Sequence, residues 1–130
     1  MADRFIWYEL MTTDQDAAIA FYGAVVGWNA ADHPNSAASG KRYVVLSVGD
    51  LGVGGIFGLN DEMLANGARP GWVGYVGVDD TDAKLEQLVD AGGTVLMPAN
   101  DIADVGRFAM VADPGGAPFY LLQPRPPEGG

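Results

Sequence analysis

The segment that decides the fold reads Phe5-Ile-Trp-Tyr-Glu-Leu-Met-Thr-Thr-Asp14 and continues through Ala17-Ala-Ile-Ala-Phe-Tyr-Gly23 to Gly27-Trp28. Residues 5–11 are aromatic or apolar nearly throughout, which predicts a strand covered on both faces. Asp14 is a residue type that caps helix N-termini, and Gly27 suits the left-handed position at a helix end. The segment therefore predicts a strand, a capped helix and a glycine stop.

The predicted helix has a broad apolar stripe, because apolar residues recur at every fourth position in two neighbouring rows. The rows are Ala17, Phe21 and Val25, and Ala18, Tyr22 and Val26. Trp28 then opens a short strand. The polar, turn-rich segment from Asn29 to Gly40 predicts a mobile loop.

A degenerate copy of the strand and helix follows from Trp72 to Gly93. Asp80 starts the second helix 66 positions after Asp14 (80 − 14). The order βαβββ occurs twice, which indicates two copies of one supersecondary unit. The later strands are expected at Arg42 to Val48 and Leu51 to Leu59 in the first copy, and at Thr94 to Met97 (stopped by Pro98), Arg107 to Val111 and Pro118 to Gln123 in the second.

These two modules define the predicted architecture. They cover about residues 4–60 and 71–124 of one domain over residues 1–124, and residues 125–130 are expected to form a flexible tail. Neither module alone would bury its sheet face, so we expect the two to complete each other. The predicted class is α+β, with two βαβββ modules forming a curved mixed sheet, as half-barrels, around a pseudo-twofold cleft. Gly54-Gly55 in the first hairpin predicts a bulge or a close approach to the backbone.

The composition narrows the function classes. A net charge of −10 argues against binding a nucleic-acid backbone and favours a cationic over an anionic ligand. The absence of cysteine excludes disulfides, thiolate metal sites and a cysteine nucleophile. The sequence shows neither a signal-peptide pattern nor an apolar run of about 18 residues, so we expect a cytoplasmic protein that does not insert into a membrane.

Short motifs are spread over nearly the whole chain. They are Trp7-Tyr-Glu-Leu, Asp14, Phe21-Tyr-Gly23, Gly27-Trp28, Val78-Asp79-Asp80, Gly92-Gly93, Gly106-Arg-Phe108 and Asp113-Pro114-Gly-Gly-Ala-Pro-Phe119. An early Phe-Tyr before a glycine, paired with a late Asp-Pro-x-Gly turn, resembles the vicinal oxygen chelate superfamily, the fold of glyoxalase I, extradiol dioxygenases and bleomycin-resistance proteins. The opening strand is similar to the branch described as glyoxalase-like. Such a resemblance implies a fold more than a reaction, since one fold hosts many functions.

The resemblance also implies a place for a divalent metal, because enzymes of this superfamily bind one in the cleft with His or Glu side chains. The positions concerned hold Trp7, Phe57 with its neighbours Gly55 and Gly58, Val73 or Trp72, and Tyr120. None of these is a metal ligand except, weakly, the tyrosine. The single histidine, His33, lies in the polar loop, away from these positions. We therefore expect no metal centre and no cofactor.

Strand alternation places Trp7 and Glu9 on one face of the first strand, together with Phe5 and Met11. The family register implies that this face lines the cleft. The resemblance implies that the ligand-binding aromatic residues there are Trp7, Phe57, Tyr75 and Tyr120. Aromatic residues around one acid are typical of a site for a planar or cationic small molecule. Such residues are also typical of a plain core.

Glu9 is the leading candidate for a functional role, because burying an acid in an apolar strand is costly unless the acid is paired or hydrated. The alternative is a structural pair with Arg107 or Arg42. Arg107 is also a candidate to bind an anionic group of a ligand. If Glu9 is partly desolvated, its pKa rises and it can serve as a general acid or base.

Two functions remain open. The first is a metal-independent protein that binds an aromatic or cationic small molecule, similar to bleomycin-resistance proteins. The second is a lyase, isomerase or related enzyme with Glu9 as general base and Tyr75 or Tyr120 as hydrogen-bond donor, or a metal-dependent enzyme with atypical ligands. A structural or regulatory protein with a filled cleft is a further alternative. A homodimer paired through edge strands near Trp28 and Val95 is compatible with either function.

Overall fold

Eight strands and three helices make up the part of the chain that the computed structural model describes, residues 3–33, 42–102 and 105–124. They follow the order βαβββ twice, with a short helix between the two series. The α+β class and the repeat predicted from the sequence are therefore confirmed. In chain order the elements are β1 (Arg4–Thr12), α1 (Gln15–Val26), β2 (Asn29–Asp32), β3 (Tyr43–Val48), β4 (Leu51–Gly58), α3 (Asp61–Ala65), β5 (Gly71–Gly77), α4 (Thr81–Asp90), β6 (Thr94–Ile102), β7 (Gly106–Ala112) and β8 (Pro118–Pro124).

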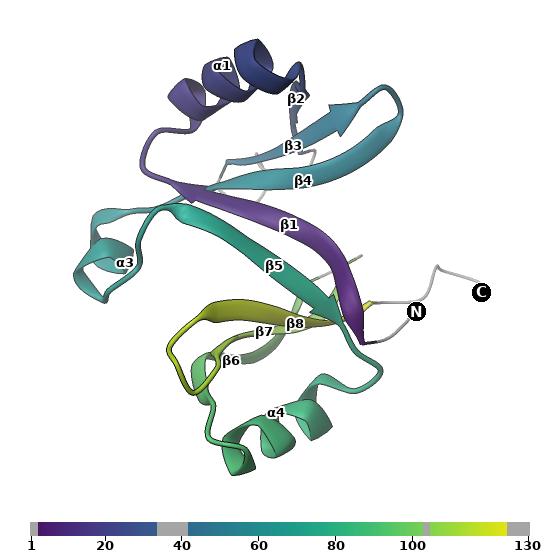
Figure 1. The fold of residues 1–130 in the computed structure, drawn as a ribbon, viewed down its shortest axis with the longest axis vertical. Helices are drawn as coiled ribbons and strands as arrows, with labels where there is room; N and C mark the ends of the chain where they lie inside the picture. Colours follow the sequence, from purple (N-terminus) through teal and green to yellow (C-terminus); the bar gives the residue numbers. More distant parts are fainter. Residues whose placement is uncertain (1–2, 34–41, 103–104, 125–130) are drawn as a thin grey trace. The chain divides into compact units, whose positions relative to one another are not determined.

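The chain is divided into two compact units. The first unit is Trp7–Val73, and the second combines Met1–Ile6 with Gly74–Gly130. In the first unit the strand order is β2-β3-β4-β1, with β1 parallel to β4 and the other pairs antiparallel (Figure 1). In the second unit the order is β5-β8-β7-β6, with β5 parallel to β8 and the other pairs antiparallel. Each unit therefore has a mixed sheet with the same topology.

An aspartate begins each of the two longer helices, as the sequence predicts. The Asp14 carboxylate accepts a hydrogen bond from the backbone N–H of Ala17 at 3.0 Å, and the Asp80 carboxylate accepts one from Ala83 at 3.1 Å. Gly27 ends α1 with a φ of 76°, a left-handed conformation that costs glycine little. These local signals fix where both helices begin and where α1 ends.

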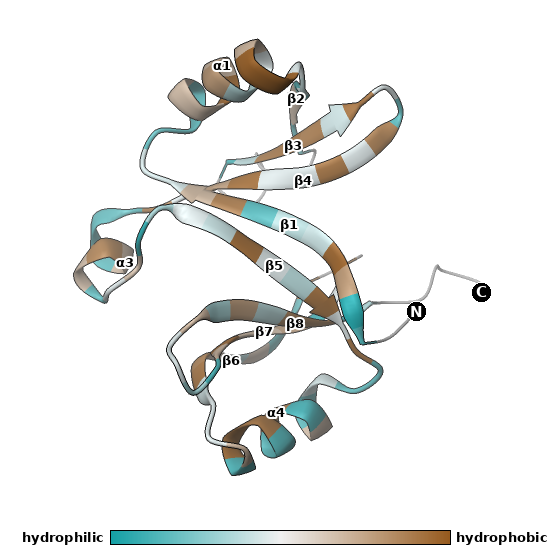
Figure 2. Cartoon of the chain, in the orientation of Figure 1, coloured by the Kyte–Doolittle hydropathy of each residue, from teal (hydrophilic) through white to brown (hydrophobic). Residues whose placement is uncertain are grey.

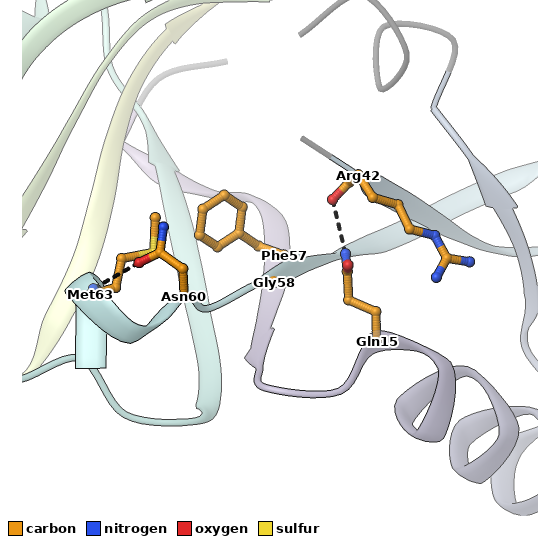
Figure 3. Close-up of a pocket in the computed structure, with 6 residues that line it drawn as sticks. All are labelled: Gln15, Arg42, Phe57, Gly58, Asn60 and Met63. Carbon is orange, nitrogen blue, oxygen red and sulfur yellow. Dashed lines mark hydrogen bonds between the residues drawn. The ribbon is translucent and has the colours of Figure 1, made fainter. Parts of the chain in front are cut away.

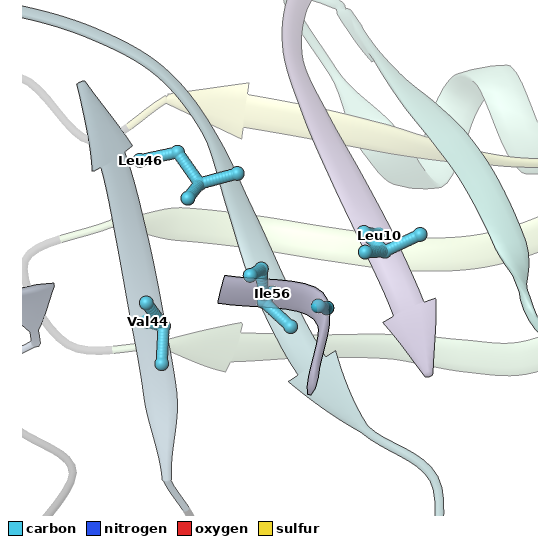
Figure 4. Packing of buried hydrophobic residues seen from close by; sticks show 5 residues of the cluster. Leu10, Val44, Leu46 and Ile56 are labelled. Carbon is cyan, nitrogen blue, oxygen red and sulfur yellow. The ribbon is translucent and has the colours of Figure 1, made fainter. Parts of the chain in front are cut away.

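The core of the first unit lies between α1 and one face of its sheet. Its buried members are Leu10 of β1, Ala18 of α1, Val44 and Leu46 of β3, and Ile56 of β4. Figure 4 shows the strand residues of this cluster on three neighbouring strands. Because side chains alternate along a strand, Glu9 lies on the opposite face, away from this core.

Only part of the predicted apolar stripe of α1 packs against this core. Ala18 is buried, and Tyr22 packs beside it. Phe21, Val25 and Val26 are 56%, 63% and 51% exposed. Figure 2 shows α1 strongly apolar (brown) toward its C-terminal end. A helix lying on a sheet buries only the side that touches the sheet, so the row of Ala17, Phe21 and Val25 remains at the surface.

The second unit repeats this arrangement with α4. Its buried core comprises Val78, Ala109, Val111 and Leu121, and Leu85 and Leu88 of α4 pack against it. Thr81, at the start of α4, is fully buried, and its Oγ1 donates a hydrogen bond to the carbonyl oxygen of Arg107 at 2.8 Å. This bond connects the first turn of α4 to β7.

Two strands differ from the prediction. The short strand predicted to open at Trp28 is present as β2, but it lies at Asn29–Asp32, at the start of the predicted mobile loop, and pairs with β3. Residues 34–41 of that loop and the predicted flexible tail 125–130 lie outside the described residues. β6 does not stop before Pro98 but continues to Ile102. It tolerates a residue without an amide hydrogen because it is an edge strand whose register shifts on both sides of Met97.

Candidate functional site

Glu9 is a buried acid on the face of β1 opposite the α1 core, and it is only 3% exposed. Its cross-strand neighbour on β4 is Gly55, which has no side chain. Gly55 pairs in turn with Val45 of β3, so three strands run side by side under this face. The surroundings of the carboxylate are therefore set by the group that lies above Gly55.

Tyr43 fills the space above Gly55. It starts β3, two residues before Val45, and its ring extends over β4. A Cβ on Gly55 would lie 2.7 Å from Cε2 of Tyr43 and would overlap its hydroxyl group. The close approach predicted at Gly54-Gly55 is therefore confirmed, and Tyr43 is the group that approaches. The predicted bulge is also present, since the register of β3 against β4 shifts beside Gly54.

A directed chain of hydrogen bonds runs from Trp7 through Tyr43 to Glu9. The indole Nε1 of Trp7, which can only donate, donates to Oη of Tyr43 at 2.9 Å. The hydroxyl of Tyr43 also donates a hydrogen bond to the carboxylate of Glu9. The Trp7 ring lies over Gly52, where a Cβ would meet it at an ordinary 3.4 Å. The structure thus joins Trp7 and Glu9 through a tyrosine that sequence reasoning missed.

These surroundings keep Tyr43 protonated. Burial raises the pKa of Tyr43 most, and the negative charge of Glu9 and the hydrogen bond to Glu9 raise it further. The hydrogen bond from Trp7 lowers the pKa, but it does not reverse the increase. Tyr43 therefore remains a hydrogen-bond donor to Glu9 throughout the physiological pH range.

His33 lies beside this chain of hydrogen bonds. Its backbone N–H donates to the carbonyl oxygen of Tyr43 at 2.7 Å, and its ring meets the Tyr43 ring edge-on with the centroids 6.3 Å apart. The sequence places His33 in the polar loop, and the structure adds that His33 contacts Tyr43, the residue bonded to Trp7. The reason is that β2, which ends just before His33, pairs with the beginning of β3.

Phe57 lies on the same face of β4 as Gly55 and is the cross-strand neighbour of Tyr43. It also lines an open pocket of about 170 Å³ (Figure 3). The other lining residues are Gln15, Arg42, Gly58, Asn60 and Met63. The pocket is smaller than sites that enclose drug-sized ligands, so it suits a small chemical group. Figure 3 shows Phe57 between Met63 on one side and Gln15 on the other.

In the second unit, Tyr75 and Tyr120 form a stacked pair. They are cross-strand neighbours on β5 and β8, with ring centroids 4.2 Å apart and planes inclined by 9°. Phe108 of β7 lies tilted against Tyr120 at 6.1 Å. These rings are on the face opposite the α4 core, because the alternate residues Ala109 and Leu121 belong to that core. The structure thus brings the two candidate tyrosines together as an aromatic pair, in which Tyr120 is buried.

The two arginines considered as partners of Glu9 have other carboxylate partners. The ion pairs are Arg42–Asp16 at 2.7 Å, Arg42–Asp32 at 2.9 Å, Arg107–Asp82 at 2.9 Å and Arg107–Asp101 at 3.3 Å. Hydrogen bonds to these aspartates raise the pKa of both guanidinium groups. Within the first unit, the structure gives Glu9 a tyrosine as its partner.

The positions at which the resemblance implies metal ligands do not fit a metal ion. They are Trp7, Phe57, Val73 and Tyr120, of which only the tyrosine has a side-chain oxygen. Among the residues that the structure describes, no group of three His, Asp or Glu side chains converges in a way that could hold a metal ion. The donor set offered by the site is instead one carboxylate with aromatic and hydroxyl groups.

A second tryptophan–tyrosine hydrogen bond lies on the α1 side of the first unit. Nε1 of Trp72 donates to Oη of Tyr22 at 3.0 Å, and Trp28 stacks on the Tyr22 ring with the centroids 5.5 Å apart. This pair combines the same donor and acceptor as Trp7 and Tyr43. It offers a matched reference for the bond at Glu9.

Known proteins resemble this chain over most of its length. The model of the Glyoxalase/Bleomycin resistance protein/Dioxygenase superfamily matches residues 4–121. The chain is 42% identical over 123 residues to "Putative glyoxylase CFP32" of Mycobacterium tuberculosis, and 30% identical over 146 residues to "Anthracycline biosynthesis protein DnrV" of Streptomyces peucetius. Both alignments cover 95% of this chain but only 45% and 48% of the relatives, so the chain spans about half the length of the curated relatives it matches.

Among solved structures, methylmalonyl-CoA epimerase from Mycobacterium tuberculosis matches with a TM-score of 0.65 and 22% identity, covering 95% of this chain and 89% of the epimerase. At this identity the likeness concerns the fold. In the described residues, no helix combines the length and the apolar character needed to cross a membrane.

Proposed function

Because residues 4–121 match that family model, this chain belongs to the Glyoxalase/Bleomycin resistance protein/Dioxygenase superfamily, and we propose that it binds a small aromatic or cationic molecule on the Glu9 face of its first unit, without a metal. The observation that carries the proposal is the buried, hydrogen-bonded carboxylate of Glu9 among aromatic side chains. An ionised carboxylate shielded from water attracts a cation more strongly than an exposed one. Trp7 and Phe57 add aromatic faces, which favour cations and flat rings.

The charge of the chain supports the same ligand class, since a net charge of −10 attracts cations to the surface. The name of DnrV refers to the biosynthesis of anthracyclines, which are flat polycyclic molecules that often carry an amino sugar. Since the chain covers only 48% of DnrV, this likeness supports a ligand class and not a reaction. A flat amine combines the features that Glu9 and its aromatic neighbours would recognise.

The second unit has candidate ligand contacts of its own. The stacked rings of Tyr75 and Tyr120 form an aromatic pair, which we propose as a ligand contact of that unit. Arg107 is the proposed contact for an anionic group of the ligand, although its guanidinium nitrogens already donate to Asp82 and Asp101.

Isothermal titration calorimetry with a matched pair of probes tests the proposal. The first probe is daunorubicin, which carries a charged amine, and the second is its uncharged aglycone. Glu9→Gln keeps the shape of the side chain and removes its charge, so it should weaken binding of the amine by at least about tenfold, or about 1.4 kcal/mol. The aglycone should bind both proteins nearly equally. The proposal is contradicted if neither probe binds, or if Glu9→Gln binds the amine as tightly as the unaltered chain.

A second candidate function is proton transfer at carbon, with Glu9 as the general base. The burial of Glu9 favours it, because desolvation makes a carboxylate a stronger base. The solved structure of similar fold is named a methylmalonyl-CoA epimerase, and epimerisation requires a proton to leave and return at one carbon. Incubation with methylmalonyl-CoA in D₂O tests this function by mass spectrometry. Deuterium incorporation that Glu9→Gln abolishes supports it, and incorporation no faster than in buffer contradicts it.

A further inference from the structure

We propose that Tyr43 is the positioning residue of this site, and that it holds the carboxylate of Glu9 ionised and in one orientation. The inference rests on the proposed function, in which Glu9 meets the ligand. It assigns a role to a residue that carries no ligand-binding or catalytic prediction from the sequence.

The place of Tyr43 is built into the sheet. Glu9 and Gly55 are cross-strand neighbours on β1 and β4, and Tyr43 comes from β3, on the far side of β4. The phenol ring therefore has to cross β4 to reach the acid. It can do so because Gly55 has no Cβ, which would otherwise occupy the place of the hydroxyl group. The arrangement requires a tyrosine at position 43 and a glycine at position 55 together.

The direction of the hydrogen bonds decides what Tyr43 can do. The N–H of Trp7 donates to the hydroxyl oxygen, so the single phenol proton is left for Glu9. A neutral donor bonded to a carboxylate stabilises the ionised form, whereas burial favours the protonated form. Tyr43 therefore opposes the effect of burial. Since its proton is committed to Glu9, Tyr43 acts on a ligand through Glu9.

With the hydrogen bond from Tyr43 in place, Glu9 can still bind a cationic group. A carboxylate has room for about four hydrogen bonds, so the bond from Tyr43 is compatible with a further bond to a cationic group. In the first unit, Tyr43 is a titratable side chain that faces the carboxylate, and the ring of His33 contacts the Tyr43 ring behind it. The bond from Tyr43 also restricts the rotamers of a long side chain, which lowers the entropy lost when a ligand binds.

Carbon-13 NMR of the glutamate carboxyl carbons tests this role without a ligand. The sequence contains four glutamates, so the Glu9 signal can be assigned by its loss in Glu9→Gln. Tyr43→Phe removes the hydroxyl and keeps the ring, and we expect it to move the midpoint of the Glu9 titration to higher pH. Tyr22→Phe is the matched control. It removes a hydroxyl that also accepts a tryptophan N–H, at 3.0 Å, and should leave the Glu9 midpoint unchanged.

Binding of the amine probe at neutral pH gives a second readout. Tyr43→Phe should weaken it by about tenfold, the usual consequence of losing a hydrogen bond to a charged group, and Tyr22→Phe should change it by less than about twofold. An unchanged Glu9 midpoint in folded Tyr43→Phe overturns the inference, whatever the probe does. A raised midpoint in a chain that binds no probe supports the role of Tyr43 and contradicts the proposed function alone.

A further variant keeps the inference open to refutation if Tyr43→Phe does not fold. Trp7→Phe removes the N–H that turns the Tyr43 proton toward Glu9, and it should move the Glu9 midpoint in the same direction by a smaller amount. An unchanged midpoint in Trp7→Phe then overturns the inference. Circular dichroism spectra identical to that of the unaltered chain establish that each variant is folded.

Discussion

Gly55→Ala adds one methyl group, and that group should decide whether the Tyr43 ring can stay above β4. The new Cβ would lie 2.7 Å from Cε2 of Tyr43 and closer still to its hydroxyl. Atoms cannot approach so closely, and the backbone of β4 is held by its neighbours on both sides. The Tyr43 ring therefore has to move off the strand. Both hydrogen bonds of its hydroxyl, from Trp7 and to Glu9, are then lost.

The expected cost follows from these two bonds. A hydrogen bond between neutral groups contributes about 1 kcal/mol to stability, and one to a charged group about 1.5–3 kcal/mol. Replacing glycine by alanine also restricts the unfolded chain, which stabilises by about 0.4–1 kcal/mol where the backbone is not left-handed, as at Gly55. The net loss in the free energy of unfolding should be about 2–3 kcal/mol. Urea denaturation followed by circular dichroism measures it.

The decisive comparison places Gly55→Ala in a Tyr43→Ala background. Without the ring, the new Cβ no longer meets Tyr43, so the substitution should be neutral or stabilising by up to about 1 kcal/mol. Gly52→Ala is the control in the same strand, because its Cβ would meet Trp7 at an ordinary 3.4 Å and should cost little. If Gly55→Ala costs the same with and without the Tyr43 ring, the reasoning is refuted.

Three further predictions concern pH, the helix starts and a buried threonine. Burial and the charge of Glu9 raise the pKa of Tyr43. Above about pH 10 the Tyr43 hydroxyl therefore loses its proton in the unfolded chain but keeps it in the folded chain. The free energy of unfolding should then fall by up to about 1.4 kcal/mol per pH unit. Urea denaturation at increasing alkaline pH should show this slope in the unaltered chain and not in Tyr43→Phe, and equal slopes contradict it. Asp14→Ala and Asp80→Ala should each lower the free energy of unfolding by about 1 kcal/mol in the same assay, and the Asn variants should retain most of the cap. Thr81→Val should cost about 1–3 kcal/mol because a carbonyl loses its buried donor, and Thr81→Ser should cost clearly less, so equal losses would argue against the hydrogen bond.

The repeat could be predicted from the sequence because local signals mark it. Asp14, Asp80 and Gly27 act on their own helix ends, and each acts as predicted. The extent of strand β2 over Asn29–Asp32 could not be predicted in the same way. Its sequence, Asn-Ala-Ala-Asp, is exposed throughout and has weak strand propensity. It is a strand because β3 offers it an edge, which depends on how the chain folds back and not on its own residues.

The candidate site was predictable only where a residue breaks a local pattern. Glu9 could be singled out because it is an acid in an apolar strand. Tyr43 could not, because a tyrosine at the start of a strand is ordinary and its contact with Glu9 crosses a third strand. The signal that was present is Gly54-Gly55, which predicts a close approach but does not name the approaching group. The position of His33 depended in the same way on the pairing of β2 with β3.

The register of the two units shows which positions are equivalent. In each unit, a residue on the first strand (β1 or β5) pairs with a residue on the last strand (β4 or β8). That residue pairs in turn with one on the preceding strand (β3 or β7). The residue two positions earlier on that strand completes the set. The equivalent sets are Glu9, Gly55, Val45 and Tyr43 in the first unit, and Tyr75, Tyr120, Met110 and Phe108 in the second.

The two sets differ most at the position of Gly55, which Tyr120 occupies in the second unit. In the first unit Gly55 leaves a space, and Tyr43 crosses it to reach an acid. In the second unit Tyr120 fills the equivalent space and stacks on Tyr75 with the ring centroids 4.2 Å apart. Its ring centroid lies 6.1 Å from that of Phe108. Phe108 has no hydroxyl group to donate, and Tyr75 stands where the first unit has its acid. One scaffold thus yields a hydrogen-bonded carboxylate in one unit and a stacked aromatic pair in the other, which is why we propose polar recognition for Glu9 and stacking for the tyrosines.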